Sequence, residues 1–189
     1  QKPDESENDY EIRLEAFKTL LLFLYCGPRR KEVDVLMWDQ VDFENSSIEI
    51  RHTEYFRPKS ESSVGVVYFE PAVGEILREY RDDDPTGIFV LKGGPPKPEV
   101  SYPYYRADKT FKFLIAWLRS YEGPDGALPM ATVQKPIHEL RKEVGAMLNS
   151  RYGLFAANKV LRHAQISTTA NYYVDEKEKL SVGLALKGK

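Results

Sequence analysis

The sequence predicts a single, mostly helical domain with one small antiparallel β-sheet (class α+β). Apolar residues recur at helical spacing in several segments, whereas only a few short segments are rich in β-branched and aromatic residues. There is no internal repeat. The 189 residues fall within the range of one domain, and the 42% hydrophobic content is enough to fill one sizeable core.

In the first half of the chain, Gly27 and Pro28 separate two helices, since glycine ends a helix readily and proline begins one. Two strand-like segments follow, joined by a long polar stretch that contains Pro58 and Lys59. The expected elements are a helix over residues 10–25, a second helix from Pro28 to about Trp38, a hairpin of strands 48–52 and 64–69, and a helix over residues 71–80.

The second half is expected to be helical, apart from a proline- and glycine-rich loop over residues 93–103. A short third strand is expected before that loop. The expected elements are the strand over residues 87–91, helices over 107–121, 137–148, 155–161 and 168–174, and an amphipathic segment over 177–186.

These elements divide into a polar linker over residues 1–9, a domain over 10–176 and a tail over 177–189. The chain starts at Gln1 without an initiator methionine, so we expect a further N-terminal domain. The longest apolar run is far shorter than the roughly 20 residues that span a bilayer, and no signal-peptide pattern is present. We therefore expect a cytoplasmic protein in which Cys26, the only cysteine, is a buried inert thiol.

The overall charge weighs against a nucleic-acid partner, because the net charge is −2 and the pI is about 6.0. Total charge averages over the whole surface, however. A basic cleft can coexist with acidic patches such as residues 82–84.

The first candidate site residues are Arg29 and Glu32. Arg29 and Arg30 follow Pro28 at the start of a helix, where the helix dipole disfavours cations by about 0.3–1 kcal/mol. A bound anion would reverse that penalty. Glu32 lies one turn further on and can orient Arg29, although a surface salt bridge is the simpler interpretation of this pair taken alone.

A second pair, His138 and Arg141, has the spacing that places both side chains on one helix face. Both are donors suited to phosphate oxygens, although an exposed polar face is the simpler interpretation of this pair taken alone. The helix cannot be that of a zinc protease, because Lys142 stands where a second histidine would be required.

The segment from Leu161-Arg162-His163 to Thr169-x-x-Tyr172 resembles the C-terminal signature of the tyrosine site-specific recombinases, the phage integrase family. In that family a Leu-Gly-His turn precedes a Thr-x-x-Tyr element whose tyrosine is the nucleophile. Tyr172 has the family's spacing, nine positions after His163.

Three further boxes occur in the family's order: Gly27-x-Arg29-x-x-Glu32, Lys59 with the serines after it, and His138-x-x-Arg141. The resemblance covers residues 17–173. It departs from the family's pattern at three positions. Arg162 replaces the usual glycine, Pro28 replaces the usual leucine, and Gly65 stands in place of the common arginine of the sheet.

The resemblance implies the fold of the recombinase catalytic domain and DNA cleavage and rejoining through a 3′-phosphotyrosine. It implies no metal or cofactor, and the sequence has neither a phosphate-binding glycine-rich loop nor a carboxylate cluster at metal-ligand spacing. The implied roles are Tyr172 as nucleophile, Arg29, Arg141 and His163 as donors to the phosphate, His138 as base, Lys59 as acid and Glu32 in support.

The implied partners are double-stranded DNA, further copies of the protein in a tetrameric synapse, and an accessory DNA-bending protein. The apolar tail over residues 177–189 is expected to dock on a neighbouring protomer. The protein would associate with the nucleoid of a prokaryote or with phage DNA. Three alternatives remain: a type IB topoisomerase, a non-catalytic DNA-binding relative, and an all-helical interaction domain with chance matches.

Overall fold

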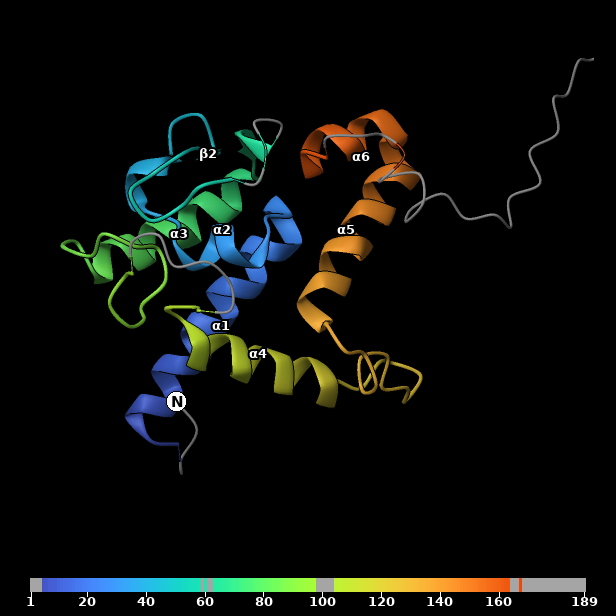
Figure 1. Ribbon diagram of the computed structural model, residues 1–189. Coiled ribbons are helices and arrows are strands. Elements are labelled where there is room, and N and C mark those ends of the chain that lie inside the picture. The colour runs from blue at the N-terminus through green and yellow to red at the C-terminus, as the bar shows by residue number, and fades with distance from the viewer. Residues whose placement is uncertain (1–4, 59, 61–62, 98–103, 164–166, 168–189) are drawn as a thin grey trace, which may run out of the picture.

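The computed structural model describes residues 5–58, 60, 63–97, 104–163 and 167 (Figure 1). Within these residues the chain is mostly helical with a three-stranded antiparallel sheet, which confirms the predicted fold class. The elements are α1 (Glu7–Cys26), α2 (Arg30–Asp34), the 3-10 helix η1 (Trp38–Gln40), β1 (Val41–Asp42), β2 (Ser47–Ile50), β3 (Gly65–Tyr68), α3 (Pro71–Asp83), α4 (Asp108–Ser120), α5 (Pro136–Tyr152) and α6 (Leu154–Leu161).

Helix α1 forms where it was predicted, and both of its ends follow from local chemistry. The Ser6 hydroxyl accepts the Asp9 amide at 3.1 Å and satisfies one of the free donors of the first turn. Gly27 takes a left-handed conformation with φ 57° and donates to the Phe23 carbonyl at 3.2 Å. This turn directs the chain into α2, which carries the first candidate site residues.

Helix α2 is much shorter than predicted, because the chain pairs with a distant segment instead of continuing the helix. The Trp38 amide donates to the Ile88 carbonyl at 3.0 Å, and the Val90 amide donates to the Leu36 carbonyl at 2.8 Å. The helix therefore ends at Asp34, and only the short η1 follows it.

The prediction of a third strand over residues 87–91 is wrong, because this segment pairs with the residues after α2 and not with the sheet. That segment forms only the isolated bridge between Met37 and Phe89. The third strand of the sheet is β1, where no strand was predicted. Its residue Val41 pairs with Ile48 of β2.

The predicted hairpin of β2 and β3 is confirmed. The strands pair antiparallel, with Ile48 opposite Val67 and Ile50 opposite Gly65. Ile48, Ile50 and Val67 are buried, whereas Glu49, Val66 and Tyr68 between and beside them are exposed. The loop of this hairpin carries Lys59, so the buried face of the sheet fixes where that loop begins and ends.

One hydrophobic core joins the sheet to the helices. Helix α1 packs against both α4 and α5, and α5 packs against α6 (Figure 1). Cys26 is buried at the end of α1, as expected, and burial raises the pKa of its thiol to about 12. Among the described residues, no helix is both long and apolar enough to cross a membrane.

We expect Phe111→Ala to lower the free energy of unfolding by about 3–5 kcal/mol, because this ring is fully buried in the core and its loss leaves a cavity. Phe155→Ala is the matched control. That ring is 81% exposed, and its removal should change stability by about 0.5 kcal/mol or less. Urea denaturation measures both variants, and equal losses would contradict the assignment of Phe111 to the core.

Candidate active site

The junction of α1 and α2 meets the end of α6, more than 120 positions further along the chain. Arg141 of α5 joins these two points, since its guanidinium donates to the carbonyls of Gly27 and Leu161. Arg141 is only 5% exposed. His138 and Arg141 therefore do not form a simple exposed polar face, because Arg141 is buried and its guanidinium connects the ends of two helices.

Arg29 lies at the N-cap of α2 and is held from two sides. Its Nη1 donates to Oε1 of Glu32 at 2.8 Å, and its backbone amide donates to Oε2 of the same carboxylate at 2.7 Å. Its Nη2 donates to the carbonyl of Arg162 at 3.2 Å. The Arg29 side chain keeps 37% of its surface exposed, so a ligand can reach a guanidinium that the protein has already oriented.

Glu32 orients Arg29 as predicted, but the pair is not a surface salt bridge, because Glu32 is only 3% exposed. Burial alone would raise the pKa of the Glu32 carboxyl. The positive charges of Arg162 and Arg29, with two hydrogen bonds from Arg29, outweigh that effect and lower the pKa. Glu32 is therefore a carboxylate at neutral pH.

Arg162 is a site residue that the sequence marked only as a departure from the family's glycine. Its Nη2 lies 2.5 Å from Oε2 of Glu32, and its Nε donates to the Ser63 carbonyl at 3.1 Å. The residue has φ 51° and ψ 50°, the left-handed region that glycine adopts easily. The signal was therefore visible: a long cation at a helix end where the pattern favours glycine needs a strong partner.

His163 follows directly and is half-buried. Its amide donates to the Asn158 carbonyl at 3.2 Å, and Asn158 Nδ2 donates back to the His163 carbonyl at 3.3 Å. Burial, followed by the charges of Arg141, Arg29, Arg162 and His138, lowers the pKa of His163 to about 4. The imidazole is therefore neutral at pH 7 and lies close to the cations of the site.

His138 lies in the first turn of α5 and is exposed. Partial burial, together with the charges of Lys142 and Arg141, lowers its pKa. The structure thus brings Arg29, Glu32 and Arg141 together at the turn that carries His163, and His138 lies on α5, one turn before Arg141.

Lys59 and Tyr172 lie outside the described residues, as do the predicted helix over 168–174 and the tail. Their assigned roles therefore stay predictions. Among the residues that are described, no three His, Cys, Asp or Glu side chains are grouped so that they could hold a metal ion.

No family model and no curated protein matches the sequence. Solved structures do match. The Tn1549 transposon integrase in complex with transposon right end DNA superposes with a TM-score of 0.60 at 20% identity, over 93% of this chain and 61% of that one. The same integrase with circular intermediate DNA gives 0.57 at 18% identity, over 93% and 62% of the two chains. XerA recombinase gives 0.55 at 20% identity, over 91% and 60%.

The chain therefore has the fold of the tyrosine recombinase catalytic domain, which confirms the fold that the motifs implied. It spans about three fifths of the length of these solved chains. At this identity the likeness is one of fold.

We expect the imidazole of His163 to titrate near pH 4 in the free protein instead of near its ordinary value of 6.5. Because the native state disfavours the proton, the contribution of His163 to stability is fully present above pH 6.5 and is lost as the pH falls toward 4. A titration of the histidine carbon–proton signals by NMR, assigned with His163→Gln, measures the midpoint. A midpoint at 6.5 would show that the cations do not act on this ring.

Proposed function

We propose that this chain cleaves and rejoins DNA strands in site-specific recombination, through a covalent 3′-phosphotyrosine. The observation that supports it most is the meeting of Arg29, Arg141 and His163, from three distant segments, around the turn that ends α6. The likeness in fold to recombinases solved with DNA supports the same function.

The site suits a phosphodiester because it carries more positive charge than its own carboxylate neutralises. Glu32 faces two guanidiniums, those of Arg29 and Arg162, and Arg141 adds a third cation close by. Donors that are already oriented stabilise the charge that develops on the phosphoryl oxygens without reorganising during the reaction. Arg29 is the member that a DNA phosphate can reach directly.

In the proposed reaction the Tyr172 oxygen attacks the phosphorus and forms the phosphotyrosine bond, while the bond to the 5′ oxygen breaks. His138 accepts the tyrosine proton, and Lys59 donates a proton to the leaving 5′ oxygen. A 5′ hydroxyl of a second strand then reverses the step. The proton and bond balance closes without a metal or a nucleotide cofactor.

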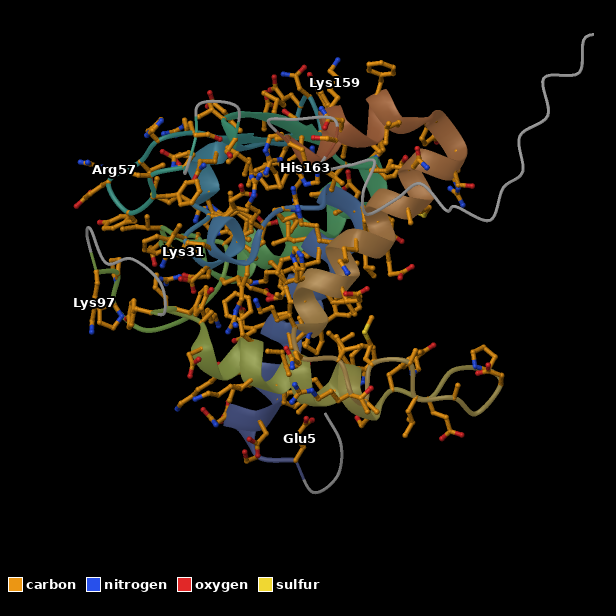
Figure 2. All side chains as sticks on the ribbon, turned by 45° about the vertical axis from the view of Figure 1, so that its right-hand side comes forward. Glu5, Lys31, Arg57, Lys97, Lys159 and His163 are labelled. Carbon is orange, nitrogen blue, oxygen red and sulfur yellow. The ribbon has the colours of Figure 1, made fainter. Side chains whose placement is uncertain are left out.

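A net charge of −2 does not exclude DNA as the partner, because charges can be unevenly distributed. In Figure 2 the labelled Lys31, Arg57, Lys97 and Lys159 lie in the upper and left-hand part of the molecule, as does His163, whereas Glu5 lies at the lower end. Lysines and arginines on that side of the molecule are available to DNA phosphates.

The wider assembly belongs to the same proposal. Further copies of the chain would form a tetrameric synapse on DNA, joined by the tail over residues 177–189, and an accessory DNA-bending protein would assist. A type IB topoisomerase would reseal the same strand, and a non-catalytic relative would bind DNA without an adduct. Incubation with a pool of nicked duplexes of randomised sequence separates these outcomes, since only the recombinase joins strands from two duplexes.

We expect Tyr172→Phe to abolish the denaturant-stable protein–DNA adduct, because phenylalanine lacks the attacking oxygen. Tyr173→Phe is the matched control and should retain most of the adduct, since only Tyr172 has the spacing from His163. Denaturing gels of labelled nicked duplexes measure both variants. An adduct that peptide mapping assigns to Tyr173 would contradict the choice of nucleophile.

We expect Lys59→Ala to lose cleavage of ordinary DNA and to recover it on a substrate whose leaving group is a bridging 5′ thiol. A thiolate leaves without a general acid, so the missing proton no longer matters. Arg57→Ala, two positions away and on the same loop, should show no such recovery. Recovery by Arg57→Ala alone would mean that the acid has been assigned two residues too far along the hairpin.

A further inference from the structure

Arg162 adopts a conformation that its side chain makes costly. Among the described residues, only Ser46 and Arg162 have a positive φ without being glycine. The left-handed region brings the β-carbon of an ordinary residue close to the backbone, so it persists only where the surroundings hold it. Arg162 is 6% exposed, so those surroundings are protein atoms.

Three separate segments hold Arg162. Its side chain donates to Oε2 of Glu32 in α2 and to the carbonyl of Ser63, next to β3. Its own carbonyl accepts from Nη2 of Arg29. One residue thus contacts the arginine that faces the ligand, the carboxylate that orients that arginine, and the end of the hairpin loop.

The side chain of Arg162 lies close to Gly65 of β3. A β-carbon at Gly65 would lie 3.4 Å from Cδ of Arg162, which is ordinary van der Waals contact. The φ of 151° at Gly65 is unfavourable for any side chain, so the backbone conformation, more than the space, favours glycine there.

The hydrogen bonding of the Arg162 guanidinium is incomplete. Its Nη1 is buried, and no hydrogen-bond partner for it is found among the described residues. A buried unsatisfied donor is unfavourable by itself. The ion pair with the buried carboxylate of Glu32 offsets this cost. Since Arg29 pairs with the same carboxylate, the two guanidiniums together carry one positive charge more than Glu32 balances.

We infer that Arg162 is a positioning residue of the active site, which holds Glu32 and through it Arg29 in place for the phosphate and joins them to the hairpin that carries Lys59. This inference rests on the proposed function. Arg162 acts through Glu32 and Arg29 and need not touch DNA. The alternative is a buried ion pair that serves stability alone.

The test compares Arg162→Met and Arg162→Lys with Arg106→Met. Arg106 is the matched control, because it is 9% exposed, donates to two backbone carbonyls and has one buried nitrogen without a hydrogen-bond partner, yet it does not contact Glu32 or Arg29. Single-turnover cleavage of the randomised nicked duplexes and the Kd for the same DNA are measured at a temperature where circular dichroism shows each variant folded.

We expect Arg162→Met to cleave at least about tenfold more slowly with a Kd within about threefold of the parent, because a transition-state donor is misplaced while DNA binding stays. Arg162→Lys should recover part of the rate, since an ammonium can still pair with Glu32. Arg106→Met should lose stability and leave the rate within about threefold. Equal rates for Arg162→Met and the parent, or an equal loss in Arg106→Met, would overturn the positioning role.

A readout that needs no catalysis separates this inference from the proposed function. In the parent the Nε–Hε signal of Arg29 should be sharp and dispersed in an NMR spectrum, because Glu32 and the Arg162 carbonyl hold the group. Arg162→Met should broaden it, and Arg106→Met should not. If the parent forms no adduct, the proposed function fails, and the Arg29 signal alone then tests the positioning role of Arg162. An unchanged Arg29 signal in Arg162→Met overturns that role, and a lost signal supports it.

Discussion

The site depends on one buried carboxylate shared by two guanidiniums. Glu32 is nearly inaccessible to solvent, and it pairs with Arg29 at 2.8 Å and with Arg162 at 2.5 Å. Taking a carboxylate out of water is unfavourable, and removing one partner of a buried pair typically costs about 3–5 kcal/mol. The start of α2 and the turn after α6 are therefore fixed relative to each other, although 130 positions separate the two partners.

The cations of the site also complete the ends of helices. The last carbonyls of a helix lack partners within it and carry partial negative charge. Arg141 donates to the carbonyls of Gly27 and Leu161, and Arg29 donates to that of Arg162, so guanidiniums satisfy these groups at the ends of α1 and α6. The same side chains thus hold the backbone and supply the positive field, which explains how a basic site arises in a chain with a net charge of −2.

Local patterns predicted the parts of the structure that local chemistry determines. Gly27 ended α1 as expected, the alternating strands formed the hairpin, and the spacing of Arg29 and Glu32 produced their ion pair. The end of α2 and the absence of a strand over residues 87–91 could not be predicted, because both follow from pairing between residues 36–38 and 88–90, which no local pattern encodes. The departure from glycine at position 162 was visible in the sequence, but the partners of Arg162 were not, since Glu32 and Ser63 lie far along the chain.

The neutrality of His163 follows from its burial and from the same excess of positive charge. Burial and the neighbouring arginines lower its pKa to about 4, so the ring is neutral at pH 7 and adds no fourth cation to the arginines around it. A DNA phosphate would relieve the repulsion among the arginines, so phosphate binding is favoured where the arginines meet even though the surface as a whole is slightly acidic. Binding of this kind weakens as salt rises, because it replaces counterions. In this fold, the ion pairs that hold the helices together also leave the positive charge that the proposed phosphate binding requires.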